Sequence, residues 1–265
     1  MAEQRQQVDL LTVLGLGLLL MPLTTMWHEI GGHALACVVQ GGRLQAVGAF
    51  YVDCTAPGRA AAVVVAVAGV AVDTIAALVL VQFWRRAQGD LARLVLWLAW
   101  CDKAMVAAGY FLFSGVTGLG DLGPGDSDGI GPLPFPWAWR AVEMLIGGLA
   151  YALVIRAAIR MLTAMLGDSP DTRTSRRRIA HGYYAAAGCA SVLVGLLNPL
   201  GLFITLASAA AASFGGLAGL ISVGFAVPRG EEVRPFTVPR SWPVIVAGLV
   251  VAVAFAAVLG PSVSG

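Results

Sequence analysis

Charged residues are scarce in this chain. Only 12% of its 265 residues are charged, 58% are hydrophobic, and the formal net charge is +2. A soluble domain carries about 25% charged residues, so this chain has too few of them to cover a globule in water. The nearly balanced charge argues against nucleic-acid binding, and the high apolar content argues against intrinsic disorder. The composition therefore predicts a protein embedded in a lipid bilayer.

The chain also lacks the cysteine spacings of a disulfide scaffold or a zinc ribbon. Its four cysteines show no C-x-x-C pair and mostly fall within apolar runs; they are Cys37, Cys54, Cys101 and Cys189. We expect them to be small buried hydrophobic residues. The N-terminus lacks the short apolar core and cleavage site of a signal peptide, so we expect the first apolar run to stay in the mature protein.

Long apolar runs dominate what remains. A membrane-spanning helix needs about 20 mostly apolar residues. The runs that meet this length cover residues 9–39, 59–84, 91–114, 137–160, 179–197, 200–227 and 241–261. They predict an all-α polytopic membrane protein with about seven transmembrane helices and a short extended segment after the first. We divide the chain into a core of three spans, 1–136, which includes the loop 41–58, and four further spans of unassigned role, 137–265.

The basic residues predict the orientation of these spans. Thirteen of the 17 basic residues fall on the N-terminal side of the predicted membrane or at the helix ends nearest to it. The opposite side receives Arg43, Arg59 and Arg140, and Lys103 lies within a span. Because positively charged residues stay in the cytoplasm, we expect a cytoplasmic N-terminus and an outer C-terminus, as in a protein of the bacterial inner membrane.

A few ionisable residues interrupt the apolar runs. They are His28, Glu29, His33, Asp73, Asp102, Lys103 and Glu143. Each costs at least about 2.5 kcal/mol to place in a bilayer, so each is a candidate for function. Adjacent helical residues point about 100° apart, so Asp102 and Lys103 should each find a partner on another span. Asp73 or Glu143 could pair with Lys103.

The segment from His28 to His33 has the composition of a hydrolytic zinc site. Two histidines that flank a carboxylate can bind Zn²⁺, while the carboxylate takes a proton from water. In the usual motif the histidines are four residues apart, which places them about 40° apart around a helix. Here they are five residues apart, which corresponds to about 140°. A one-residue bulge at Gly31-Gly32 would realign them. The alternative is a pair of packing histidines in a polar helix interface.

Three stretches resemble the site-2 protease superfamily of intramembrane zinc metalloproteases. His28-Glu29-Ile30-Gly31-Gly32-His33-Ala34 resembles the family's H-E-x-x-H-A helix, with H-E-x-x-x-H in place of H-E-x-x-H. Gly41 to Val52 is similar to its glycine-started extended segment. Ala68 to Asp73 is similar to its A-G-P-x-x-N pattern, with Val70 for proline and Asp73 for asparagine.

This resemblance implies roles for particular residues. His28 and His33 would be zinc ligands, and Glu29 would be the catalytic base. The third ligand would be an aspartate after the third span, where Asp121 is the first choice, Asp128 the second and Asp126 the third. Asp73 would orient the substrate or support a histidine from behind.

The implied activity is zinc-dependent cleavage of peptide bonds in or near the membrane. The substrate would be a membrane protein or peptide, which the extended segment from Leu44 to Val52 could hold by strand addition; an ordinary loop with a short hairpin is the alternative. Members of the family open their site to the cytoplasm, whereas the arginine count places this site nearer the outer face. Two other functions remain open: a non-catalytic relative with or without zinc, and an ion or solute transporter that uses the intramembrane acids.

Overall fold

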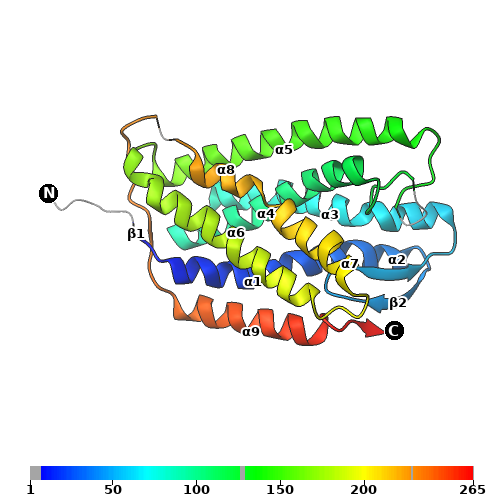
Figure 1. The fold of residues 1–265 in the computed structure, drawn as a ribbon. Helices are drawn as coiled ribbons and strands as arrows, with labels where there is room; N and C mark the ends of the chain where they lie inside the picture. The colour runs from blue at the N-terminus through cyan, green and yellow to red at the C-terminus, as the bar shows by residue number, and fades with distance from the viewer. Residues whose placement is uncertain (1–6, 126–128, 228, 265) are drawn as a thin grey trace.

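The computed structural model describes residues 7–125, 129–227 and 229–264, and these residues are mostly helical. The helical elements are α1 (Leu10–His28), η1 (Glu29–Ala34), α2 (Leu35–Val39), α3 (Arg59–Arg86), α4 (Asp90–Thr117), α5 (Pro136–Leu166), η2 (Pro170–Thr172), α6 (Arg173–Gly195), α7 (Leu202–Ile204), η3 (Thr205–Gly215), α8 (Gly219–Phe225) and α9 (Trp242–Val258). The long helices run side by side, with β1 (Gln7–Val8) at one end of the bundle and β5 (Val263–Ser264) at the other (Figure 1).

Each of the seven ranges predicted from the sequence is helical over most of its length. Among the described residues, four stretches are long and apolar enough to cross a membrane: Leu10–Val39, Arg59–Arg86, Pro136–Leu166 and Ala207–Phe225. α9 is apolar but shorter. α4, of 28 residues, and α6, of 23 residues, are not among these four stretches.

Some predicted boundaries are wrong. Residues 161–178, which lie between the predicted spans 137–160 and 179–197, are mostly helical, because α5 continues to Leu166 and α6 already begins at Arg173. The chain turns only at Gly167, whose φ of 91° favours glycine. The predicted span 200–227 is also not one regular helix, since η3 has π geometry and separates α7 from α8.

The core lies where α1, α4 and α6 meet. Leu16, Trp97, Leu98 and Tyr183 are fully or almost fully buried there. α1 packs against α6 and α9, and α4 packs against α3 and α5. This arrangement places α1, its continuation η1, and α4 in the interior of the bundle, and these elements carry five of the seven ionisable residues noted in the apolar runs.

Asp9 caps the start of α1. Its Oδ1 accepts a hydrogen bond of 2.9 Å from the backbone N–H of Thr12, and Arg240 lies 3.2 Å from its Oδ2. Although burial acts against ionisation, these contacts hold the pKa of Asp9 below its ordinary value of 3.8. The cap therefore stabilises the beginning of the helix that carries the site.

The segment after α2 forms a β-hairpin. Strand β2 (Arg43–Val47) pairs antiparallel with β3 (Val52–Thr55), and β5 pairs with the other edge of β2, so the sheet order is β3-β2-β5. A second pair, β1 with β4 (Thr237–Val238), is parallel. The fold is therefore helical with two small sheets rather than purely helical.

The expectation that the cysteines are buried is right for Cys37 and Cys101 and wrong for Cys54 and Cys189. Cys37 and Cys54 form a disulfide that joins α2 to β3, and Cys189 is exposed. Cys101 is a free buried thiol. The disulfide forms because the hairpin folds back over α2, and a separation of 17 residues in the sequence does not reveal this.

Candidate metal site

The bulge predicted at the H-E-x-x-x-H segment is present as the π-helix η1. The N–H of Leu35 bonds to the carbonyl of Ile30, five residues earlier. In this geometry residues five apart lie on one face of the helix, because each turn holds one additional residue. The Nε2 atoms of His28 and His33 are consequently 3.2 Å apart, and both side chains are buried.

Two glycines allow η1 to lie directly against α3. A Cβ on Gly32 would stand 2.7 Å from the Cα of Gly69. A Cβ on Gly69 would stand 2.5 Å from the Nε2 atoms of both His28 and His33. Gly32 therefore permits close backbone approach, and Gly69 leaves space next to the two imidazoles.

Asp121 completes the group from the loop after α4. The helix ends at Gly118, whose φ of 79° is the left-handed conformation that commonly stops a helix. The loop then brings Asp121 Oδ2 to 3.3 Å from His28 Nε2 and 3.2 Å from His33 Nε2. The structure thus brings together the first-choice aspartate and both histidines. Asp126 and Asp128, the other two candidates, lie outside the described residues.

The second nitrogen of each imidazole is held from behind. His33 Nδ1 lies 2.7 Å from the carbonyl oxygen of Val65, and His28 Nδ1 lies 2.8 Å from Asp73 Oδ2. A carbonyl can only accept, and a carboxylate also accepts, so each Nδ1 carries the hydrogen. In the neutral rings the two Nε2 lone pairs then point at the same small space that Asp121 faces. Two lone pairs 3.2 Å apart repel each other unless a proton or a metal ion lies between them.

The geometry of the group fits a zinc ion. The three ligand atoms form a triangle with edges of 3.2, 3.2 and 3.3 Å. Ligands about 2.0–2.1 Å from a tetrahedral zinc ion are about 3.4 Å from one another. The space that Gly69 leaves open is on one side of this triangle. Two imidazoles and one carboxylate are also ligands that zinc accepts.

The charge of Asp121 agrees with a ligand role. Desolvation opposes its ionisation, but when the two imidazoles are protonated, the charge of His33 and the hydrogen bonds that His28 and His33 donate outweigh this effect. They then hold the pKa of Asp121 well below its usual range. Asp121 is therefore a carboxylate that can bind a cation directly.

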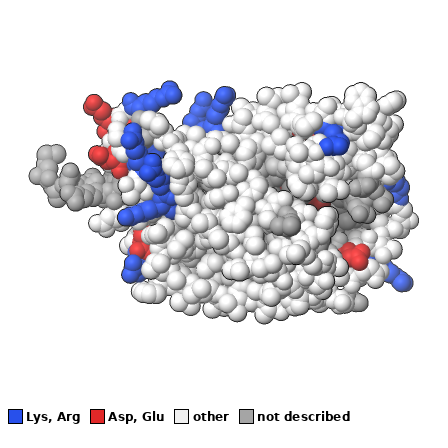
Figure 2. Space-filling view, viewed as in Figure 1, with Lys and Arg blue, Asp and Glu red and all other residues white. Residues whose placement is uncertain are grey.

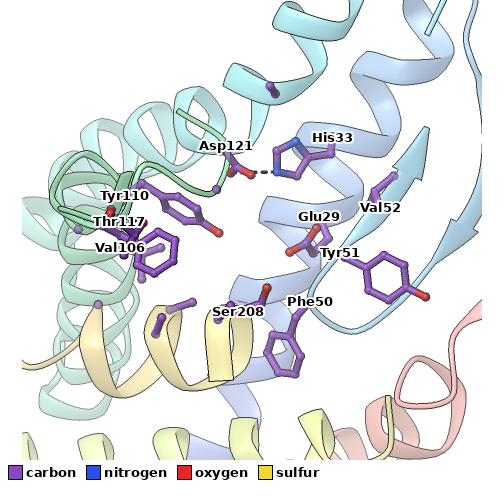
Figure 3. A pocket seen from close by; sticks show the side chains of 18 of the residues that line it. Glu29, His33, Phe50, Tyr51, Val52, Val106, Tyr110, Thr117, Asp121 and Ser208 are labelled. Carbon is purple, nitrogen blue, oxygen red and sulfur yellow. Dashed lines mark hydrogen bonds and ion pairs between the residues drawn. The ribbon is translucent and has the colours of Figure 1, made fainter. Parts of the chain in front are cut away.

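Glu29 lies beside the group at the wall of a cavity of about 780 Å³. Figure 3 shows Glu29, His33 and Asp121 around one end of this cavity. The hairpin, α4 and η3 form the other walls of the cavity. They contribute, for example, Tyr51 from the hairpin, Tyr110 from α4 and Ser208 from η3. The cavity therefore combines a polar end with walls that are largely apolar.

Asp102 and Lys103 on α4 also find partners. Lys103 Nζ lies 2.8 Å from Asp73 Oδ1, which identifies the partner among the two candidates considered. Asp102 accepts a hydrogen bond of 3.1 Å from the hydroxyl of Tyr183 on α6, and it also lies 3.7 Å from Lys103. Both residues thus have partners on other helices, as predicted. Glu143 is buried on α5 and is not a partner of Lys103.

Some residues of the site had no role assigned from the sequence. The ring of Tyr110 stacks on His28 with centroids 4.8 Å apart, and the Val65 carbonyl orients His33. A tyrosine in an apolar helix does not indicate from the sequence that it stacks on a histidine. A backbone carbonyl is present at every residue, so the sequence cannot indicate that Val65 orients His33. Gly69 lies within the Ala68 to Asp73 pattern, which is the one signal that could have drawn attention to it.

Comparison of the chain with models of protein families, with curated proteins and with solved structures found no match. The fold and the site together define a largely helical protein with a three-residue group that could hold a metal ion.

Proposed function

We propose that this protein is a zinc-dependent intramembrane endopeptidase that resembles the site-2 proteases. The observation that carries the proposal is the convergence of His28, His33 and Asp121 on one point with Glu29 beside it at the cavity wall. Two ligands with supported Nδ1 atoms, an anionic third ligand and an adjacent carboxylate are the components of a hydrolytic zinc centre.

In this proposal the bound metal ion and Glu29 have different roles in hydrolysis. A bound zinc ion would supply a Lewis acid that polarises a peptide carbonyl and makes water more acidic. Glu29 would accept a proton from water as the oxygen of that water bonds to the carbonyl carbon. Glu29 would then return the proton to the amide nitrogen as the C–N bond breaks, which leaves a carboxylic acid and an amine.

The hairpin provides a place for an extended substrate. In the order β3-β2-β5, β3 is an edge strand, and its residues Val52, Asp53 and Cys54 line the cavity. A peptide in a helix has its amides bonded within the helix, so it must unwind before cleavage. Backbone hydrogen bonds to the edge of β3 would hold the unwound segment beside Glu29.

We propose seven membrane spans with the N-terminus in the cytoplasm and the site near the outer face. Figure 2 shows most of the visible Lys and Arg near the end of the bundle at which β1 lies in Figure 1. The Cys37–Cys54 disulfide lies at the other end, with the hairpin, and disulfides persist in oxidising compartments outside the cytoplasm. These two independent features favour the same orientation, in a membrane such as the bacterial inner membrane.

Zinc content and cleavage together test the proposal. The purified protein should hold one zinc ion per chain and cleave a single-span model peptide that carries a fluorophore and a quencher on either side of its apolar segment. Glu29→Gln should retain the zinc and lose cleavage, whereas His28→Ala should lose both. Zinc without cleavage, and no effect of Glu29→Gln, would identify a non-catalytic relative. A protein without zinc would instead favour the transporter.

A further inference from the structure

Lys103 is the only lysine in the sequence, and it is 3% exposed in the interior of the bundle. Its Nζ donates hydrogen bonds of 2.7 Å to the carbonyl oxygen of Thr24 on α1 and of 2.8 Å to Asp73 Oδ1 on α3. Asp102 Oδ1 is 3.7 Å away. One ammonium group on α4 therefore contacts the two helices that carry His28 and its supporting carboxylate.

The carboxylate of Asp73 is shared between two partners. Its Oδ1 accepts from Lys103 at 2.8 Å, and its Oδ2 lies 2.8 Å from His28 Nδ1. A carboxylate held at both oxygens cannot rotate about its terminal bond without losing one hydrogen bond. Lys103 therefore restricts the direction from which Asp73 meets His28, although Lys103 does not touch the imidazole.

Lys103 is itself held in place. Asp102 is bonded to the hydroxyl of Tyr183 on α6, so the buried polar chain extends from His28 through Asp73, Lys103 and Asp102 to Tyr183. Every side chain in it is buried. Replacing a buried ion pair with apolar residues is often neutral or favourable for stability, so folding alone is a weak reason for such a chain. A stronger reason is that this chain of polar side chains ends at His28, a candidate metal ligand.

We propose that Lys103 is a positioning residue of the metal site, which acts through Asp73 to hold the ring of His28 in the orientation that binds the metal. This inference rests on the proposed function, because it requires that His28 is a ligand. It also gives the second half of the chain a part in the site, since Tyr183 on α6 supports Asp102 beside Lys103.

Zinc affinity tests the inference without any substrate. We expect Lys103→Met, which keeps the length of the side chain but removes its charge and donors, to weaken zinc binding by about 10- to 100-fold in competition with a chromogenic chelator. The visible spectrum of Co²⁺ bound in place of zinc should also change, because the ring of His28 is no longer fixed. A purely structural role would lower the unfolding temperature and leave the affinity and the spectrum of the folded protein unchanged.

Two further variants complete the experiment. The double variant Lys103→Met, Asp73→Asn should bind zinc no more weakly than Asp73→Asn alone, because Lys103 acts through Asp73. An additional loss of zinc affinity in the double variant would overturn the proposal, also if Lys103→Met alone does not fold. Glu143→Gln, which changes a buried carboxyl on α5 outside this chain, is the matched control and should bind zinc as the wild type does.

The result also separates the two proposals. A wild-type protein that binds no zinc refutes the metal site and the function built on it. A wild-type protein that binds zinc, with a folded Lys103→Met variant that binds it equally well or more tightly, refutes the positioning role alone.

Discussion

Gly69→Ala should remove metal binding by adding one methyl group. The new Cβ would stand 2.5 Å from the Nε2 atoms of both His28 and His33. Non-bonded heavy atoms are normally about 3.5 Å apart, so both imidazoles would have to retreat by about 1 Å. Zinc sites tolerate deviations of about 0.2 Å in the ligand distance. The two nitrogens could then no longer share one ion.

The size of the effect follows from this displacement. A misplacement of 1 Å at a reacting centre can cost about 100-fold, and we expect at least this loss in zinc affinity, or about 2.7 kcal/mol. Over-packing itself costs about 1–3 kcal/mol of stability. The higher helix propensity of alanine offsets up to about 1 kcal/mol of this cost, so the variant should still fold.

The matched control is Gly31→Ala, in η1. A Cβ on Gly31 would meet nothing closer than 3.7 Å, an ordinary contact with the ring of Trp27. Zinc affinity of both variants would be measured by chelator competition, and their unfolding temperatures would be measured with the chelator present. A folded Gly69→Ala variant that binds zinc as tightly as Gly31→Ala does would refute our placement of the metal.

Three further predictions concern the rest of the fold. Replacing Cys37 and Cys54 with serine should destabilise the protein by about 3 kcal/mol, because the disulfide closes a loop of 17 residues. A reductant should destabilise the wild type but not this variant. Equal unfolding midpoints of the oxidised wild type and the variant would contradict this prediction. Asp9→Ala should cost about 1 kcal/mol in chemical unfolding at neutral pH. Because folding lowers the pKa of Asp9, its contribution is present above its ordinary pKa of 3.8 and is lost as the pH falls, so wild type and variant should converge in acid. Gly58 lies at an open position before α3. In a protein in which serine replaces Cys189, Gly58→Cys should react with an impermeant maleimide in intact cells. Labelling only after lysis would reverse the proposed orientation.

Local patterns were sufficient for much of the fold and for the centre of the site. Apolar runs indicated the helices, since the length of such a run reflects the need to bury or embed it. The five-residue spacing of His28 and His33 required a bulge, and Gly31-Gly32 indicated its place, which η1 now occupies. Asp121 was favoured over Asp126 and Asp128 because it directly follows the third predicted span.

Contacts between distant segments were not predictable in the same way. The disulfide needed the hairpin to fold over α2, and β5 joined β2 from the opposite end of the chain. No local pattern distinguishes Cys37, which is bonded, from Cys101, which is not. The change from α to π geometry at Thr205, and the interruption between Gly215 and Gly219, were missed as well.

The sequence by itself determined which residues are apolar, where the helices run and which histidines and carboxylates are available, because hydrophobicity and side-chain chemistry are local properties. Only the tertiary structure decided which of these groups meet. The approach of Gly69 to the two imidazoles, the choice of Asp73 as the partner of Lys103 and the joining of α2 to β3 all depend on how helices pack. Packing is set by the shapes of residues far apart in the chain, and so it appears only when the whole chain has folded.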